Sequence, residues 1–409
     1  MSLQDFRKSL DASTLPAGVI GSDARIPGLF GDVPLIYADY VASGRALRQV
    51  EDFVATQVLP FYANSHTEAS YCGSYMTRLR NEARAEIGRA VGANTDDAVI
   101  FAGSGATAGL NRLVSLFGVQ KARQPVVLIG PYEHHSNILP WRESRAKVVE
   151  IPEGPSGGPD IGILKATLSE HSGADLLIGS FSAASNVTGI VSDPDPVTRM
   201  LRSHGALAVW DYAGGGPYLP IDMGTGETRK DAVVVSPHKF PGGPGASGVL
   251  VVNRNAVQRQ CPSAPGGGTV SFVSPWRHDY SNDLATREEA GTPNVIGDIR
   301  AALAFIVKGA IGTEEIARRE TRWNAMALEG WADNPHLTLL GADHPHRLPI
   351  FSFLVHDKNG APVHQQLFTR MLSDIYGIQA RGGCACAGPY AHRLLGIDQA
   401  TSDSLRAEL

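Results

Sequence analysis

The amine of Lys239, positioned by the apolar strand that precedes it, could bind an aldehyde covalently. The lysine comes shortly after the run 233–235, where a buried strand would end. Lysine is rarely buried without a role. Burial and nearby positive charge lower the pKa of such an amine, so it becomes a nucleophile toward an aldehyde. The plain alternative for this residue, taken by itself, is a solvated loop lysine.

Asp211 is a carboxylate that could act together with the amine of Lys239. It directly follows the apolar run 207–210 and precedes small residues. A carboxylate here can pair with the pyridine nitrogen of pyridoxal 5′-phosphate (PLP), and the protonated ring is then an electron sink. The alternative is a turn or helix N-cap aspartate, which is common after strands. We expect Lys239 and Asp211 to flank one ring, with PLP held on Lys239 as a Schiff base.

The elements that must position these side chains are short apolar runs alternating with helical patterns. Nearly continuous Val, Ile, Leu and Ala are typical of strands buried on both faces, and such runs occupy 98–102, 126–129, 176–179, 207–210, 232–235 and 248–252. The helical patterns between them predict an α/β fold with a largely parallel sheet. Polar clusters follow five of these runs, where ligands of such sheets bind.

The last third of the chain has a different pattern. A loop with Gly266–Gly268 precedes a long helical stretch at 295–331, a strand at 346–355 and a helix at 363–376. A chain of 409 residues is also too long for one ordinary core. We therefore predict an N-terminal segment, a large domain and a smaller α+β C-terminal domain, over residues 1–30, 31–294 and 295–409.

Composition excludes several classes of protein. Hydrophobic residues make up 43% and charged residues 19%, and the net charge of −5 comes without a long run of Lys or Arg. That balance argues against nucleic-acid and membrane-surface partners. The N-terminus does not resemble a signal peptide, and four cysteines do not make a disulfide framework. We expect a cytoplasmic protein with free thiols.

Three motifs together resemble the class V aminotransferases, which are PLP enzymes of fold type I. The resemblance is strongest to the cysteine desulfurase and selenocysteine lyase branch, and it runs from about Tyr37 to Pro389. The motifs are Asp211-x-Ala213, Ser236-x-His238-Lys239 and Glu133-His134-His135-Ser136-Asn137-x-x-Pro140-Trp141. It implies a seven-stranded type of sheet in the large domain and a homodimer with shared active sites.

The resemblance also implies a cofactor site. His134 would stack on the PLP ring, although a lone histidine is more often structural. A helix predicted to begin near Ala106 would point its amides at the phosphate. Gly268 and Thr292 would reach the site of the neighbouring subunit, although the glycine loop by itself reads as flexible. The other residues placed around the cofactor are Thr107, Asn186, Ala213, Ser236 and His238.

Cys386 is the candidate acceptor of sulfur. It follows Arg381 by five residues, as the catalytic cysteine does in the desulfurase loop that this segment resembles. A thiolate there would attack the sulfur of the bound substrate and form a persulfide, and Arg381 would favour the thiolate. Cys384 could form a disulfide with Cys386, whereas no second pair at zinc spacing follows. The alternative is two small buried residues at a glycine-rich turn.

Two departures from the family leave the reaction open. Gly214 stands where desulfurases usually carry Gln, and no arginine matches the position that grips the substrate carboxylate. Alternatives are a class V aminotransferase, lyase or epimerase with Cys386 not catalytic, and a non-catalytic partner protein. We expect a small amino-acid substrate and a sulfur-acceptor protein as partners. Candidates for substrate binding are Tyr40, Arg45, His66, Tyr71, Arg381, Arg393 and Arg406.

Overall fold

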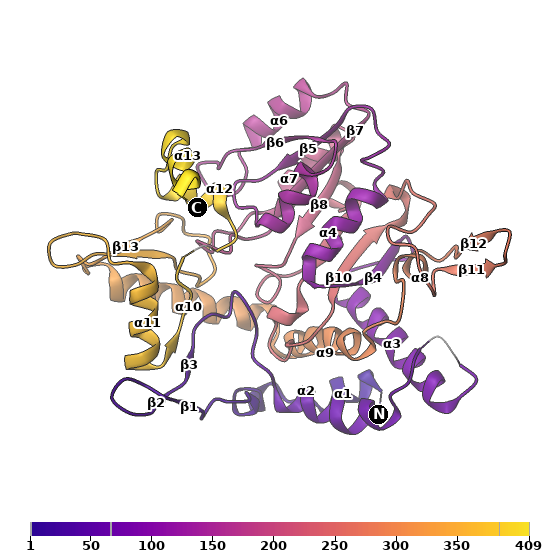
Figure 1. Ribbon diagram of the computed structural model, residues 1–409, viewed down its shortest axis with the longest axis horizontal. Helices are drawn as coiled ribbons and strands as arrows, with labels where there is room; N and C mark the ends of the chain where they lie inside the picture. The colour runs from indigo at the N-terminus through magenta and orange to yellow at the C-terminus, as the bar shows by residue number, and fades with distance from the viewer. Residues whose placement is uncertain (1, 66–67, 384, 409) are drawn as a thin grey trace.

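A seven-stranded mixed sheet forms the centre of the protein, with helices on both faces (Figure 1). The computed structural model describes residues 2–65, 68–383 and 385–408. Within this sheet β10 runs antiparallel to both neighbours, and the other neighbouring pairs are parallel. The predicted α/β fold is therefore confirmed. The strands follow in the order β4 (Asp97–Gly103), β10 (Gly248–Asn253), β9 (Ala232–Val235), β8 (Leu207–Asp211), β7 (Leu176–Ser182), β5 (Pro125–Ile129) and β6 (Lys147–Glu150).

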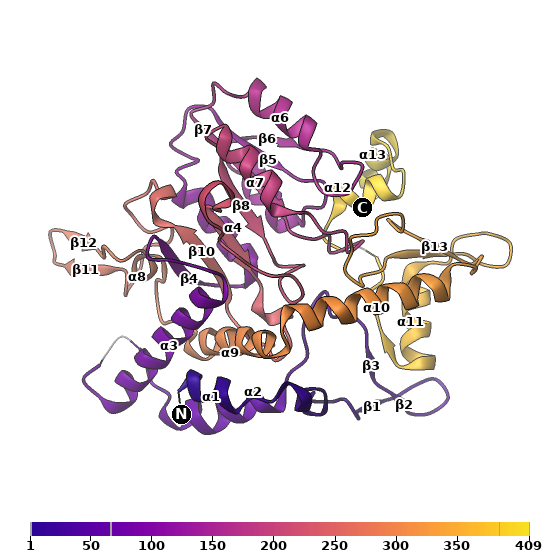
Figure 2. The ribbon, with the colours of Figure 1, turned by 180° about the vertical axis from the view of Figure 1, so that it is seen from behind.

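The central strands are apolar throughout because their side chains alternate between two hydrophobic cores. On β9, Val233 and Val235 face one core, whereas Ala232 and Val234 face the other. The second core is closed by α4 (Gly105–Leu116), which lies in front of the sheet in Figure 1. Figure 2 shows α7 in front of the opposite face. The helices that close this first core are α3 (Tyr71–Ala90), α6 (Ile161–Glu170), α7 (Pro194–Ser203) and α9 (Val295–Ile311).

The N-terminal segment packs on the helix layer and then runs to the C-terminal part of the chain. Helix α1 (Leu3–Ser9) contacts α3 and α9, and the Leu3 amide donates to Glu82 at 3.0 Å. Further along, β3 (Ile36–Tyr37) pairs in parallel with β15 (Ile378–Gln379). This pairing brings the residues after Tyr37 toward those after Gln379. The boundaries proposed at residues 30 and 294 stay a prediction.

Two expectations for the C-terminal third were wrong in detail. The helical stretch 295–331 is broken at Gly312, whose φ of +84° ends α9 before α10 (Thr313–Trp331) begins. Of the expected strand 346–355, only β14 (Phe353–Val355) forms a strand, paired with β13 (Leu337–Leu339). Prolines 345 and 349 lack the amide that a strand ladder requires. The expected helix at 363–376 is confirmed as α11 (Gln365–Tyr376).

Short elements complete the fold. The β11–β12 hairpin projects from the edge of the molecule near β4 and β10 (Figure 1). No helix in the described part of the chain is long and apolar enough to cross a membrane. The remaining elements are α2 (Arg48–Phe53), α5 (Leu139–Arg142), α8 (Leu284–Glu288), α12 (Gly388–Leu394), α13 (Gln399–Glu408), β1 (Arg25–Ile26), β2 (Val33–Pro34), β11 (Val270–Val273) and β12 (His278–Tyr280).

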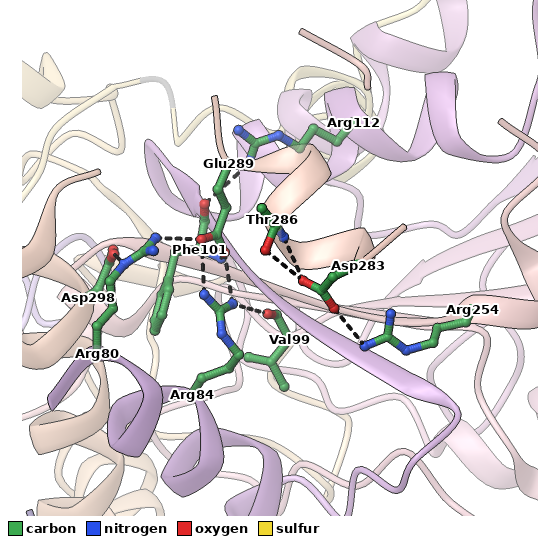
Figure 3. Close-up of polar contacts among 10 residues, drawn as sticks. All are labelled: Arg80, Arg84, Val99, Phe101, Arg112, Arg254, Asp283, Thr286, Glu289 and Asp298. Atoms are coloured by element: carbon green, nitrogen blue, oxygen red, sulfur yellow. Dashed lines mark hydrogen bonds and ion pairs between the residues drawn. The ribbon is translucent and has the colours of Figure 1, made fainter. Parts of the chain in front are cut away.

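A buried ionic cluster joins α3, β4 and α9 (Figure 3). Glu289 accepts from Arg84 at 2.8 Å, from Arg80 and from the Phe101 amide at 2.7 Å. Arg80 also bonds Asp298 at 2.7 Å. Burial alone would raise the pKa of Glu289, but bonds from Arg84 and Arg80 outweigh it and lower that pKa. The cluster thus holds the sheet edge against its helix layer with a carboxylate that stays ionised.

We predict that Glu289→Gln lowers the free energy of unfolding by about 3–5 kcal/mol, because two enclosed guanidinium groups lose a shared counter-charge. Denaturant unfolding followed by circular dichroism measures the change. The matched control is Glu315→Gln, which removes an equally well-formed pair with Arg318 on the exposed face of α10. That variant should unfold as the wild type does. Equal effects of the two substitutions would contradict the structural role of the cluster.

Candidate active site

Lys239 lies on a tight turn that follows β9. The turn Pro237–Lys239 begins directly after the strand, and the N-terminal segment closes over it. The Gly44 amide donates to the His238 carbonyl at 3.0 Å. A Cβ on Gly44 would lie 2.0 Å from the Phe240 carbonyl oxygen, so only glycine allows this approach. Two distant segments therefore enclose the lysine.

The electrostatic surroundings of Lys239 identify its neighbours. Burial lowers the pKa of the amine, and Arg381 lowers it further. Asp211, Asp39 and Cys386 act in the opposite direction and raise it. The amine, the Asp211 carboxylate, the Arg381 guanidinium and the Cys386 thiol, predicted from separate motifs, thus share one electrostatic environment.

Asp211 stands at the carboxyl end of β8, 3% exposed. Its Oδ1 accepts the Ala213 amide at 2.7 Å, so the small residue two positions later fixes the orientation of the carboxylate. Burial raises the pKa of Asp211, while the Ala213 amide and Lys239 work against that shift. A buried carboxylate of this kind is stabilised by any cation placed beside it.

His134 follows β5 and caps the turn His135–Asn137. Its Nδ1 accepts the Ser136 amide at 3.1 Å. Burial, together with the charge of Lys239, lowers the pKa of His134 to about 4, so the ring is neutral at pH 7. A neutral imidazole can lie flat against a cationic heterocycle without charge repulsion.

Glu133 anchors the segment that carries His134, a role that the motif alone did not reveal. The carboxylate is buried, and it accepts the Ser182 amide at 2.8 Å, the Ser182 hydroxyl at 2.6 Å and the Asn137 side-chain amide at 2.5 Å. Ser182 lies opposite Asp211 in the β7–β8 register. Burial raises the pKa of Glu133 to about 7, and these donors oppose the shift. The network joins the end of β7 to the segment that carries His134.

The start of α4 and the lysine turn form a cluster of donors. The Ala106 amide donates to Ser236 Oγ at 2.9 Å, and the hydroxyls of Thr107 and Ser136 lie 2.7 Å apart. Gly105 begins the helix with a φ of +60°, and a Cβ there would stand 3.1 Å from both His238 and Ser236. Helix amides, hydroxyls and an imidazole thus converge at a helix N-terminus, as anion sites require.

Three hydrogen bonds hold the Cys386 loop against the segments that carry His135 and Asn186. The Asn186 side-chain Nδ2 donates to the Ala385 carbonyl at 2.6 Å, the His135 backbone amide to the Cys386 carbonyl at 2.7 Å, and the Gly388 backbone amide to His135 Nε2 at 2.9 Å. With a φ of +56°, Cys386 is the one non-glycine residue in the described ranges with positive φ. Such a backbone costs roughly 1–2 kcal/mol, so these bonds hold the cysteine in a conformation it would otherwise leave.

Arg381 lies two residues after β15 and acts on the amine of Lys239. Its guanidinium bonds Asp39 at 3.2 Å and is 45% exposed. Asp39 follows β3, and sequence reasoning missed it; its position just after a short strand carried no distinctive signal. Because β3 pairs with β15, the carboxylate and the guanidinium meet at the ends of neighbouring strands.

Other predicted residues lie elsewhere. Gly268 lines a groove of about 810 Å³ with Arg80 and Glu289, apart from the residues around Lys239, and Thr292 is exposed. Arg393 bonds Glu150 and the Pro131 carbonyl. The remaining substrate candidates are distributed as follows: Tyr40 packs edge-on against Tyr37, Arg45 covers the same ring, Tyr71 is exposed beside Phe61, Arg406 is exposed on α13, and His66 and Cys384 lie outside the described residues.

Comparisons with known proteins agree with this architecture. The family model described as aminotransferase class-V matches residues 36–407. A probable cysteine desulfurase of Halalkalibacterium halodurans is 27% identical over 87% of this chain and 85% of its own length. A cysteine desulfurase of Escherichia coli O127:H6 is 28% identical over the same shares.

Solved structures extend the likeness to the fold. The apo structure of a cysteine desulfurase from Thermococcus onnurineus NA1 superposes with a TM-score of 0.76 at 23% identity, covering 89% of this chain and 88% of that one. A cysteine desulfurase structure from Escherichia coli gives 0.70 at 22% identity, covering 97% and 92%. These values confirm the predicted fold type.

We predict that His134→Phe makes the free energy of unfolding depend less on pH between about pH 6.5 and 4 than it does in the wild type. The folded-state pKa of about 4 lies below the usual value near 6.5, so the unfolded chain binds more protons between these pH values. Stability contributed by the neutral imidazole is therefore complete above about pH 6.5 and falls as the pH drops toward 4.

Denaturant unfolding at pH 7, 5.5 and 4.5 measures this slope. The variant should lose less free energy of unfolding across the window than the wild type. The control is His278→Phe in the exposed hairpin strand β12, which should keep the wild-type slope. An unchanged slope in His134→Phe would show that the imidazole is charged or solvated in the folded protein.

Proposed function

This chain belongs to the aminotransferase class-V family, and from that premise we propose that it is a PLP-dependent enzyme that removes sulfur or selenium from a small amino acid, with Cys386 as the acceptor. The observation that carries the proposal is the placement of Lys239 and Asp211 at the ends of neighbouring strands, with the Cys386 loop held to the same end by bonds from His135 and Asn186 and close enough to act on the Lys239 amine. The similarity to proteins named as cysteine desulfurases supports the choice of reaction.

The residues fit a phosphorylated pyridine ring. Asn186 Oδ1 is buried with no hydrogen-bond partner within the described ranges, so the site holds an acceptor that a ligand can satisfy. Asp211 offers a buried carboxylate for the ring nitrogen, and His134 offers a neutral ring face. The hydroxyls of Thr107 and Ser236, the Ala106 amide and His238 would hold the phosphate.

The chemistry divides between cofactor and protein. When bound, PLP supplies an aldehyde carbon that an amine can join and a cationic ring that draws electrons from the substrate α-carbon. Asp211 keeps the proton on the ring nitrogen, because a buried carboxylate gains from a cation at hydrogen-bond distance. Lys239, whose pKa is lowered by burial, gives up its proton more readily than an exposed lysine and would carry a proton to and from the α-carbon.

Cys386 completes the proposed reaction. Its thiolate sulfur bonds the substrate sulfur while the substrate C–S bond breaks, and the electron pair of that bond stays with the carbon fragment. The fragment takes up a proton and leaves as alanine when the substrate is cysteine, and Cys386 retains a persulfide. Arg381, beside the same centre, would favour the thiolate and offers a cation to the substrate carboxylate.

The proposal includes partners. A persulfide on a half-buried cysteine needs an acceptor for its outer sulfur, so a sulfur-acceptor protein is part of it. A homodimer would let Gly268 and Thr292 reach the neighbouring site, since in this chain they lie apart from Lys239. The large domain at 31–294 would carry the cofactor, and the smaller one at 295–409 the cysteine.

Incubating the purified protein with PLP should give a visible absorption band that Lys239→Ala lacks, because the band requires a bond to that amine. Lys165→Ala is the matched control, an exposed lysine on α6 whose loss should leave the band intact. Absence of the band from the wild type would overturn the cofactor proposal. An intact band in Lys239→Ala would move the attachment to another lysine.

Replacing Cys386 with alanine should reduce sulfide release from L-cysteine in the presence of a thiol by about a hundredfold or more, because the acceptor of sulfur is gone. Cys72→Ala on α3 is the control and should keep wild-type turnover. Unchanged release in Cys386→Ala would reject the persulfide. If, in addition, an amino donor removed the visible absorption band, transamination would replace desulfuration as the proposed reaction.

A further inference from the structure

Lys308 is a buried lysine that the proposed chemistry does not use. It lies on α9, 6% exposed, and its ammonium donates to the Gly216 carbonyl at 2.7 Å and to the Leu219 carbonyl. Both carbonyls belong to the turn that leaves Asp211. An enclosed lysine is expensive to keep unless its contacts matter.

The turn it contacts has little stability of its own. Residues 214–216 are three glycines, which lose more backbone entropy on ordering than other residues. The turn bends back sharply, with the Gly216 amide bonding the Tyr212 carbonyl at 2.6 Å and the Leu219 amide bonding the Gly215 carbonyl at 2.8 Å. An ammonium at the carbonyl end of such a turn is placed as a cation at a helix C-terminus is.

The same ammonium reaches the segment that carries the lysine nucleophile. It lies 5.5 Å from the centre of the Phe240 ring, and Phe240 directly follows Lys239. This ring packs against Phe305 of α9 at 5.0 Å between centroids. A Cβ on Gly216 would stand 3.3 Å from the same ring. One side chain therefore touches both the turn after Asp211 and the residue after Lys239.

The charge of Lys308 is poorly compensated. Burial lowers its pKa to about 7, with Glu320 of α10 opposing the shift. Burial raises the pKa of Glu320 to about 7, and its Oε1 has no hydrogen-bond partner in the part of the chain the structure describes. The Glu320 carboxylate acts on the ammonium through its charge, without a close ion pair in the described part of the chain. Replacing buried opposite charges by apolar groups is often neutral or stabilising, so stability alone explains the two groups poorly.

We propose that Lys308 is a positioning residue that fixes Asp211 and Lys239 relative to each other, by joining the turn 212–219 to Phe240. Lys308 acts through Gly216, Leu219 and Phe240. The inference deepens the proposed function and rests on it, because the spacing of carboxylate and amine matters to a ring held between them.

The first test uses the cofactor-free protein and three variants. Lys308→Met removes the ammonium, and Lys308→Met with Glu320→Gln also removes the carboxylate that would be left buried. The control is Lys230→Met, another buried lysine, which lies at the opposite end of β9 near Asp195. Hydrogen exchange read by mass spectrometry reports on segment 212–219.

Both variants that lack Lys308 should exchange this segment roughly tenfold faster than the wild type, because two carbonyls lose a charged donor. Lys230→Met should leave it unchanged. Unaltered exchange in the double variant overturns the anchoring of the turn. Because no cofactor is present, this outcome is independent of whether the protein binds PLP.

The second test measures the dissociation constant of PLP and the pH midpoint of its visible band. Both should change in Lys308→Met, with the dissociation constant rising about tenfold or more, and both should stay changed in the double variant even where thermal stability recovers. If adding Glu320→Gln restores the wild-type constant and midpoint, Lys308 serves only as a counter-ion and the positioning role is rejected. A wild type that shows no band rejects the proposed function instead, and leaves the exchange result to decide the anchoring.

Discussion

The desolvation of one amine opposite one buried carboxylate is the constraint on which the rest of this protein depends. Lys239 loses part of its hydration in the turn after β9, and its pKa falls as a result. Asp211, which is only 3% exposed at the end of β8, has its pKa raised by burial. Each group is therefore displaced from its ordinary ionisation by burial, and each is stabilised by the other. A site poised in this way gains free energy when a cationic ring is placed at Asp211 and a carbonyl carbon at Lys239, which is what the proposed cofactor offers.

The surrounding polar network keeps that pair from relaxing. Glu133 binds Ser182, the neighbour of Asp211 in the sheet, and so ties the histidine segment to the strand ends. Lys308 approaches from the opposite side and contacts the turn that leaves Asp211. In that turn, Gly214 stands where the desulfurase pattern has Gln. A Cβ at this position would lie 3.3 Å from the Ala184 carbonyl oxygen and 3.8 Å from the Cβ of Asn186. If the proposed cofactor binds here, the glutamine expected from the family resemblance is absent, and Asn186 would be the polar group at that place.

Much of the fold could be predicted because buried parallel strands are apolar at nearly every position. Runs such as 126–129 and 232–235 correspond to β5 and β9 within one residue. Strand β6, Lys147–Glu150, escaped prediction, since an edge strand with charged residues at both ends and partly exposed positions lacks the apolar signature. The strand expected at 346–355 failed for a related reason. Its apolar residues suggested a ladder, but Pro349 within it and Pro345 just before it cannot donate to one.

Residue type and local order by themselves determined that an amine and a carboxylate stand at the ends of neighbouring buried strands, because parallel strands bring their carboxyl ends to one edge of the sheet. Only the tertiary structure decided which distant groups complete the centre. Asp39 reaches Arg381 through the pairing of β3 with β15, Asn186 holds the loop of Cys386, and Lys308 arrives on a helix from the far part of the chain. These contacts join residues that are far apart in sequence. They depend on packing and on the register of strands, and neither can be read from the hydrophobic periodicity of a local segment.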